Sequence, residues 1–121
     1  MANIFLDSNK VFDIISRNTA IKKDLEGHTI YVSPLSIHIF AYSAKIKIPN
    51  KDLNDAVNEL KVVPFSPLLL TFALQGPTAD LEDNIQLHSA AESDCEYFLT
   101  EDKKLLKMKF FGKTKIVSQI S

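Results

Sequence analysis

The chain has only one cysteine, Cys95, and three glycines among its 121 residues. A single cysteine excludes an internal disulfide, and sparse use of cysteine is typical of a reducing compartment. Cys95 lies between Asp94 and Glu96. Because neighbouring anions disfavour the thiolate, we interpret Cys95 as a packed thiol and not as a nucleophile. The three glycines stand far apart, which excludes a glycine-rich phosphate-binding loop.

The sequence also lacks a charge imbalance and a long apolar run. Lys and Arg total 14 and Asp and Glu total 15, so the overall charge points neither to nucleic acid nor to a membrane surface. Prolines interrupt the most apolar segment, residues 62–74, and no run approaches the ~18–20 residues that a membrane-spanning helix needs. The N-terminus lacks the basic start and long apolar stretch of a signal peptide. We therefore expect a cytoplasmic protein without membrane contact.

The length and composition fit one compact domain over residues 1–121, with 45% hydrophobic and 24% charged residues. Short apolar runs typical of strands alternate with helix-like segments almost throughout. This alternation predicts an α/β fold, a three-layer α/β/α sandwich with a mostly parallel central sheet. The expected strands are residues 3–7, 28–32, 62–65, 96–99 and 114–117.

Three acids follow predicted strands or begin the helices after them: Asp7, Asp83 and Asp102. In open sheets of this kind, ligands bind beyond the carboxyl ends of the strands. Carboxylates are the ligands that Mg²⁺ and Mn²⁺ prefer, and nucleases use such ions to orient water and to neutralise phosphate charge. The pattern therefore suggests a site for Mg²⁺ or Mn²⁺, with Asp7, Asp83 and Asp102 as the catalytic and metal-binding residues.

Each acid also has a simpler explanation. The predicted helix 78–93, with Thr78 as its expected cap, gathers Asp80, Glu82 and Asp83 in its first turn. Acids suit helix N-termini, although like charges three residues apart repel unless a cation lies between them. Asp7 would equally suit the cap of the following helix, and Asp102 alone would be a surface residue in a turn.

The segment IFLDSN, residues 4–9, resembles the opening strand and Asp-x-Asn of the PIN-domain family, small metal-dependent nucleases that include VapC-type toxin ribonucleases. The segment YVSPLSIHIF resembles the family's next strand, its Ser/Thr-rich turn and its second helix. The resemblance extends over essentially the whole chain. It implies that Asp7 belongs to the metal site and that Asn9 supports it.

The most specific part of the resemblance is DLEDNIQLHSAAESDCEYFLTED, residues 80–102. It is similar to the family's Asp-aromatic-Glu-Asp helix start, with leucine in place of the aromatic residue, and to its strand ending in Thr-x-Asp. Through it, Asp83 and Asp102 match metal-site acids. Thr100 matches the accompanying hydroxyl, and Asp80 matches a supporting acid.

The second helix departs from the family pattern. The family usually places a glutamate about six residues after the turn serine, but this position is Ile39, and YVSPLSIHIFAYSAK contains no acid. His38 would substitute as a ligand or phosphate contact, or it is a hydrogen-bonded histidine between helix and sheet. The departure puts tight metal binding and the catalytic rate in question.

Residues 103–115 carry six lysines and no acid. Lys103, Lys104 and Lys107 lie next to Asp102 and would pair with RNA phosphates, and Phe110 and Phe111 would stack on unpaired bases. Equally, lysines suit the end of a helix, and the phenylalanines would fill the core or a dimer interface.

The leading hypothesis is a metal-dependent endoribonuclease. The resemblance further implies the toxin of a type II toxin–antitoxin pair, a homodimer and a small antitoxin that covers the site. Because the glutamate is missing, a PIN-like fold with weakened or lost catalysis, acting as an RNA-binding or protein-interaction module, is the alternative.

Overall fold

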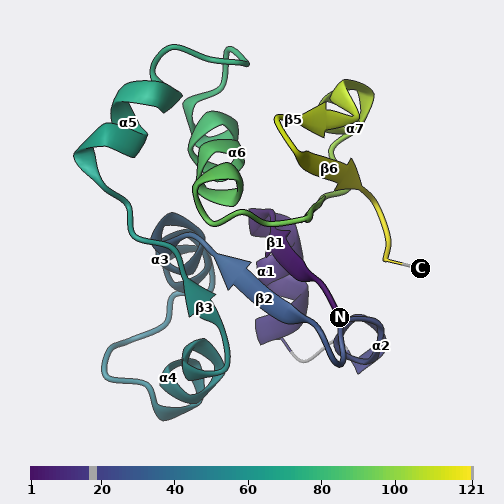
Figure 1. Cartoon of the computed structure of the whole chain (residues 1–121). Coiled ribbons are helices and arrows are strands. Elements are labelled where there is room, and N and C mark those ends of the chain that lie inside the picture. The colour runs from purple at the N-terminus through teal and green to yellow at the C-terminus, as the bar shows by residue number, and fades with distance from the viewer. Residues whose placement is uncertain (17–18, 121) are drawn as a thin grey trace.

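The computed structural model describes residues 1–16 and 19–120, and its centre is a six-stranded sheet in the order β3-β2-β1-β4-β6-β5 (Figure 1). All neighbouring strands are parallel except β5 and β6, which form an antiparallel hairpin. The parallel arrangement and the helices around it confirm the predicted α/β class. The strands are β1 (Asn3–Leu6), β2 (Thr29–Val32), β3 (Lys61–Val62), β4 (Tyr97–Leu99), β5 (Phe110–Phe111) and β6 (Thr114–Val117).

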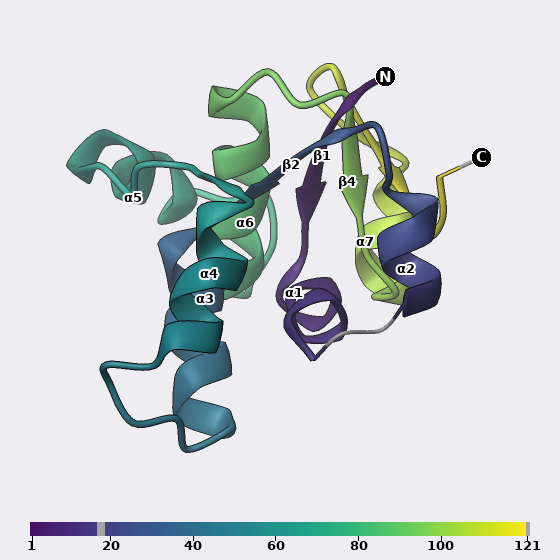
Figure 2. The same cartoon turned by 90° about the horizontal axis from the view of Figure 1, so that it is seen from below.

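Seven helices are seen in the described residues. Helices α3 (Pro34–Ser43) and α4 (Lys51–Asn58) lie on one side of the molecule. The C-terminal part, with the β5–β6 hairpin, lies on the opposite side in both views (Figures 1 and 2). No helix within residues 1–16 and 19–120 has the length and apolar character to cross a membrane. The helices are α1 (Ser8–Ile15), α2 (Thr19–Asp24), α3 (Pro34–Ser43), α4 (Lys51–Asn58), α5 (Pro67–Ala73), α6 (Leu81–Glu92) and α7 (Lys103–Met108).

The buried strand β1 contributes to a hydrophobic core on each face of the sheet, because successive side chains of a strand point to opposite faces. Ile4 and Leu6 pack with Val11 of α1 on one face. Phe5 packs on the other face with Leu87 of α6, and its ring stacks on that of Phe98 in β4 with the centroids 5.6 Å apart. The two cores hold β1 and β4 in fixed register beneath the helices.

Helix starts follow the expected capping chemistry in most cases. Ser33 and Ser66 cap α3 and α5, each with a proline at the start of the helix, and Asn50 caps α4. The cap predicted for the acidic helix is wrong: α6 begins at Leu81 and its cap is Asp80. The Thr78 hydroxyl instead donates to the Asn84 side chain at 2.7 Å.

The structure separates the two members of the C-terminal aromatic pair, Phe110 and Phe111. Both form strand β5. The Phe111 ring packs edge-on against His88 with the centroids 4.9 Å apart, so it belongs to the packing around α6. Phe110 is 55% exposed, so only this ring remains available for an external contact. The expected third strand, residues 62–65, is shorter and lies at Lys61–Val62.

Candidate acidic site

Asp7 occupies the junction between the central strand β1 and helix α1. It caps α1, where its Oδ1 accepts a hydrogen bond from the Ser8 backbone N–H at 2.8 Å. Its Oδ2 accepts from the Thr100 hydroxyl at 2.7 Å. The side chain is almost fully buried. Asp7 is thus both a cap and a buried carboxylate, and the two interpretations do not exclude each other.

Strand register explains why residues 93 positions apart meet here. Leu6 pairs with Leu99 in the parallel β1–β4 ladder, so the next residues, Asp7 and Thr100, leave the sheet side by side. The Thr100 hydroxyl oxygen also accepts from the Asp102 backbone N–H at 3.0 Å. Asp102 in turn caps α7 by accepting from the Lys104 N–H at 2.8 Å. Thr100 therefore connects the segments that carry Asp7 and Asp102.

Asp83 enters from α6, in the first turn after the cap. Its backbone N–H donates to the Asp80 carboxylate at 3.2 Å. Partial burial, then the negative charges of Asp80, Asp7, Asp102 and Glu82, raise the pKa of Asp83 to about 6 from an ordinary value of 3.8. The Asp83 carboxyl therefore lies in the common negative potential of the four other acids. The structure thus brings the acidic positions of β1, β4 and α6 to one region.

The same field acts on two other carboxyls. Burial raises the pKa of Asp7 most strongly, the hydrogen bonds from Thr100 and Ser8 lower it, and the charges of Asp102 and Asp80 raise it further. Burial also raises the pKa of Glu82, against a hydrogen bond from Ser8. The region therefore concentrates negative charge that water solvates incompletely, and a cation would relieve it.

The carboxylates are close enough to interact but do not form a preassembled cage. Within residues 1–16 and 19–120, no group of three or more His, Cys, Asp or Glu side chains is placed to hold a metal ion. Mg²⁺ usually takes only one or two protein carboxylates and retains several waters. Hard oxygen donors in a shared negative field therefore fit such a water-rich cation, and the ligand roles of Asp7, Asp83 and Asp102 stay a prediction.

The supporting residues predicted on the helices lie in more exposed positions. Asn9 is exposed in the first turn of α1. His38 is exposed on α3, with its ring centroid 6.4 Å from that of Tyr42. The interpretation of His38 as a histidine bonded between helix and sheet is therefore wrong. Lys103, Lys104 and Lys107 are exposed on α7, the helix that Asp102 caps.

A buried polar cluster beside the acids escaped the sequence analysis. The side-chain amide of Gln86 donates to the hydroxyls of Ser8 at 3.0 Å and Ser36 at 2.8 Å. All three residues are buried. The available signal was weak: Gln86 lies between Ile85 and Leu87 on α6, one turn after Glu82. A polar residue between two apolar ones does not identify its partners on α1 and α3.

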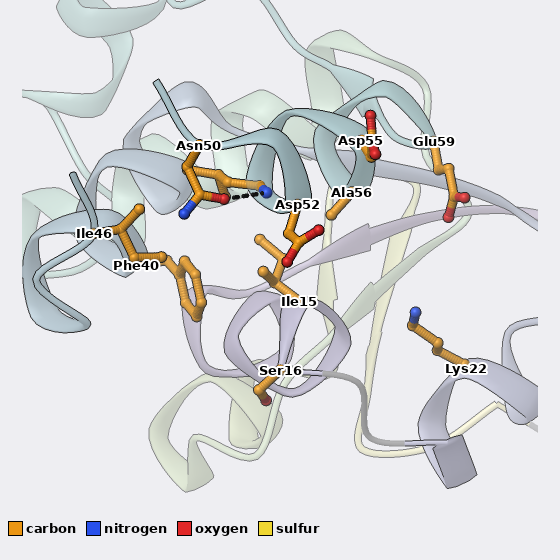
Figure 3. A pocket seen from close by; sticks show the side chains of 11 residues that line it. Ile15, Ser16, Lys22, Phe40, Ile46, Asn50, Asp52, Asp55, Ala56 and Glu59 are labelled. Carbon is orange, nitrogen blue, oxygen red and sulfur yellow. Dashed lines mark hydrogen bonds between the residues drawn. The ribbon is translucent and has the colours of Figure 1, made fainter. Parts of the chain in front are cut away.

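A hollow lies away from the acidic site, at the other end of α1 (Figure 3). Its volume is about 580 Å³. Ile15 and Phe40 line its apolar part, Asp55 and Glu59 lie along α4, and Lys22 of α2 lies on the other side (Figure 3). None of the residues predicted to act on phosphodiesters lines this hollow.

No protein-family model and no curated protein sequence matches the chain. The fold does match solved structures. One is a crystal structure of VapBC2 from Rickettsia felis bound to a DNA fragment from its promoter. The match covers 95% of this chain and 97% of the matched chain, with a TM-score of 0.64. The sequence identity is 11%, a level at which the likeness concerns the fold. The chain therefore has a PIN-like α/β/α fold.

Proposed function

We propose that the protein is a metal-dependent endoribonuclease that acts at the acidic site. The observation that supports this most is the position of Asp83 in the joint field of the acids that follow β1 and β4. Such a field attracts a divalent cation. The acids also lie at the carboxyl end of a parallel sheet, where open α/β folds bind their ligands.

In this proposal Asp7, Asp83 and Asp102 hold Mg²⁺ or Mn²⁺. The bound cation supplies an activated water and neutralises charge on the phosphodiester. Thr100 donates to Asp7 and accepts from the backbone of Asp102, so it fixes the two strand-end acids relative to each other. Asn9 and Asp80 support the site from the first turn of α1 and the cap of α6.

The exposed lysines of α7 provide the RNA contact in this proposal. Helix α7 begins directly after Asp102 and carries Lys103, Lys104 and Lys107. These lysines can therefore bind the phosphate backbone while the scissile phosphate reaches the acids. His38 is exposed on α3, so its role in this proposal is a phosphate contact at the periphery of the site.

We further propose that the protein is the toxin of a toxin–antitoxin pair and acts as a homodimer. The likeness to the VapBC2 structure, which is named for a pair of this type, supports an antitoxin partner. Apolar side chains of α5 and its C-cap support the homodimer, because Leu68 is 57% and Leu74 is 66% exposed and exposed apolar patches mark interaction surfaces. Light scattering of the purified chain, alone and mixed with a candidate antitoxin protein, tests both assemblies.

Cleavage of single-stranded RNA tests the activity. We expect cleavage with Mn²⁺ that stops with a chelator. Asp83→Asn should lower the rate at least about 100-fold, since a catalytic cation supplies several kcal/mol and each ~1.4 kcal/mol is tenfold. Glu92→Gln, at the far end of α6, removes one charge as well and should retain the wild-type rate. Equal rates for Asp83→Asn and Glu92→Gln would contradict the assignment.

One observation favours a second function, an RNA-binding or protein-interaction module without catalysis. Helix α3 contributes Ser36 and no carboxylate to the region beside Asp7, so the glutamate that the PIN-domain pattern usually places on this helix is missing. If wild type and Asp83→Asn are equally inert and both bind RNA or a partner protein, this second function is correct.

A further inference from the structure

Lys10 is a nearly buried cation that the proposed function does not use. It lies in the first turn of α1, three residues after Asp7, and is 9% exposed. Its Nζ donates to Oε1 of Glu101 at 2.7 Å. Glu101 stands between Thr100 and Asp102, directly after the end of β4. Lys10 therefore lies beside the strand ends that carry the acidic site.

A small hollow opens at Lys10, between α1, α2 and the segment that follows β6. Its volume is about 260 Å³. Leu25 and Leu99 line it, and both are buried. Asp13, one turn after Lys10 on α1, lines it as well. Because Leu99 directly precedes Thr100, this strand-end hollow adjoins the acidic site.

The size and the walls of the strand-end hollow suit one nucleobase. Pockets for drug-sized ligands usually have about 300–1,000 Å³, and this volume lies just below that range. Proteins that hold a single unstacked base place it against apolar or aromatic side chains and read its edge by hydrogen bonds. Leu25 and Leu99 supply the apolar surface, and Lys10 and Asp13 supply the hydrogen-bonding groups.

The charges around the hollow favour a base over a phosphate. Asp13 and Asp24 line the hollow, and Glu101 is the partner of its lysine. Three negative groups around one cation disfavour an anionic ligand, whereas a neutral base that offers donors and acceptors is compatible with them. An ammonium has three hydrogens, and Glu101 accepts one of them. Lys10 can therefore donate to a second acceptor.

Guanine matches this pair of groups better than the other bases do. Its O6 and N7 are acceptors to which lysine donates. Beside O6 lie the N1–H and N2–H donors, from which a carboxylate accepts. Lys10 and Asp13 are three residues apart on α1, so they are neighbours on one face of the helix. Adenine has an amino group in place of O6, and this donor would face the ammonium.

We propose that the strand-end hollow is a guanine-binding subsite, in which Lys10 donates to O6 or N7 and Asp13 accepts from the N1–H and N2–H edge. The inference rests on the proposed function and deepens it, because it names the preferred substrate: single-stranded RNA with an unpaired guanine beside the bond that is cleaved. Binding of this base holds the neighbouring phosphodiester next to the acids that follow β1 and β4.

Titration calorimetry of the metal-free full chain with 5′-GMP, 5′-AMP, 5′-CMP and 5′-UMP tests the subsite without cleavage. The four nucleotides carry the same phosphate, so a difference in affinity reports the base. We expect GMP to bind about tenfold more tightly than each of the others, as a well-made pair of base contacts allows. Equal affinities, or no measurable binding of any nucleotide at millimolar concentration, would overturn the proposal.

Two variants separate a base contact from a purely structural ion pair. Lys10→Met keeps the length of the side chain and removes the donor, whereas Glu101→Gln removes the charge of the exposed partner. We expect Lys10→Met to abolish the preference for GMP and Glu101→Gln to retain it. If both variants lose the preference equally, Lys10 acts only through its ion pair and the base contact is wrong.

Asp13→Ala tests the second contact, and it keeps the proposal testable if melting temperatures show that Lys10→Met does not fold. We expect its affinity for GMP to fall about tenfold and its affinity for AMP to stay within about twofold of wild type. Asp55→Ala on α4, outside this hollow, is the control and should retain the preference. An unchanged preference in Asp13→Ala would contradict the proposed contact.

Cleavage assays distinguish a failure of the subsite from a failure of the proposed function. If wild type cleaves RNA without any preference for guanine near the cut, and binds GMP no better than AMP, the proposed function stands and the subsite is wrong. If wild type binds GMP selectively but cleaves no RNA with Mg²⁺ or Mn²⁺, the nuclease assignment fails, and the guanine subsite belongs to the RNA-binding module of the second function.

Discussion

Two neighbouring regions at the carboxyl end of the sheet bury different kinds of polar group: one contains like charges and the other contains hydrogen-bonded neutral side chains. Beside β1 and β4, burial and then the charges of neighbouring acids raise the pKa of Asp83 to about 6. Between the starts of α1, α3 and α6, the neutral groups of Ser8, Ser36 and Gln86 satisfy most of one another's hydrogen bonds. In the first region, like charges repel one another. In the second region, hydrogen bonds hold neutral side chains in fixed positions.

The difference indicates which region binds and which region positions. A group of like charges is stabilised by a cation and destabilised without one. A neutral network gains nothing from a cation, but it fixes the elements that carry the charges. Ser8 belongs to both regions, because its backbone contacts Asp7 and its hydroxyl contacts Glu82. Variants that alter one region alone can therefore separate the two roles.

The largest stability effect is expected for Thr100→Val, which keeps the shape and removes the hydroxyl. Asp7 Oδ2 would lose its donor at 2.7 Å while staying buried. Because hydrogen bonds to charged groups contribute about 1.5–3 kcal/mol, we expect the free energy of unfolding to fall by about that amount at pH 7. Urea unfolding measures it. Thr71→Val on exposed α5, whose hydroxyl bonds only its own helix, is the control and should change little.

If Thr100→Val were as stable as wild type, Asp7 would be able to lose its donor without penalty. It would then either be protonated at pH 7 or recover a partner from solvent. Repeating the unfolding at pH 9 separates these cases. If Asp7 is protonated at pH 7, the variant becomes less stable than wild type once Asp7 is ionised, whereas a solvent partner gives no difference at either pH.

Gln86→Leu tests the neutral region. The substitution leaves the hydroxyls of Ser8 and Ser36 without the amide, but it also removes the unpartnered Oε1 of Gln86. The two effects oppose each other, so we expect a loss of stability of about 1 kcal/mol, smaller than for Thr100→Val. A gain of stability would mean that the orphaned carbonyl outweighs both hydrogen bonds. Chemical denaturation in about 1 M salt, which screens the neighbouring carboxylates, should give the same difference at pH 7 and pH 8, because neither glutamine nor leucine titrates.

The flanking lysines should affect RNA binding and not the fold. Replacing Lys103, Lys104 and Lys107 by alanine, in an Asp83→Asn background that prevents cleavage, should reduce the salt dependence of single-stranded RNA binding. Each lost phosphate contact lowers the slope of log affinity against log salt by about 0.7. Lys51→Ala on α4, whose lysine pairs with Asp55, is the control. A slope that is unchanged in the triple variant would remove these lysines from the RNA contact.

The sequence predicts the architecture better than it predicts the contacts. Alternating apolar runs indicate the parallel sheet, and Ser-Pro pairs locate the starts of α3 and α5, because these signals are local. The cap of α6 was misassigned since Thr78 and Asp80 are both good caps, and the choice depends on Asn84, which binds Thr78. The role of Ser8 was invisible, because its partners Ser36 and Gln86 are distant in sequence and meet only through the packing of three helices.

The smallest effect concerns Asp83 and its titration. Its pKa is raised on folding, from 3.8 to about 6, so the native state binds this proton more tightly than the unfolded state. The resulting stability is fully present below pH 3.8 and is lost as the pH rises through about 6. Asp83→Asn removes the dependence, so the variant should be more stable than wild type at pH 7, and the difference should shrink toward pH 4. Because Asp83 is partly exposed and an acid suits the start of α6, the gain should stay below about 1 kcal/mol.

Thermal unfolding of metal-free protein between pH 4 and pH 7 measures this difference, with Glu92→Gln as the control for loss of one negative charge. Saturating Mn²⁺ should reverse the order of stability at pH 7, because a cation that binds only the native wild-type site stabilises it by mass action. A metal-free Asp83→Asn that is less stable than wild type at pH 7 would mean that Asp83 stabilises the start of α6 more than its neighbours repel it. The acids would then be ordinary helix-start residues, and the contrast between a binding region and a positioning region would be lost.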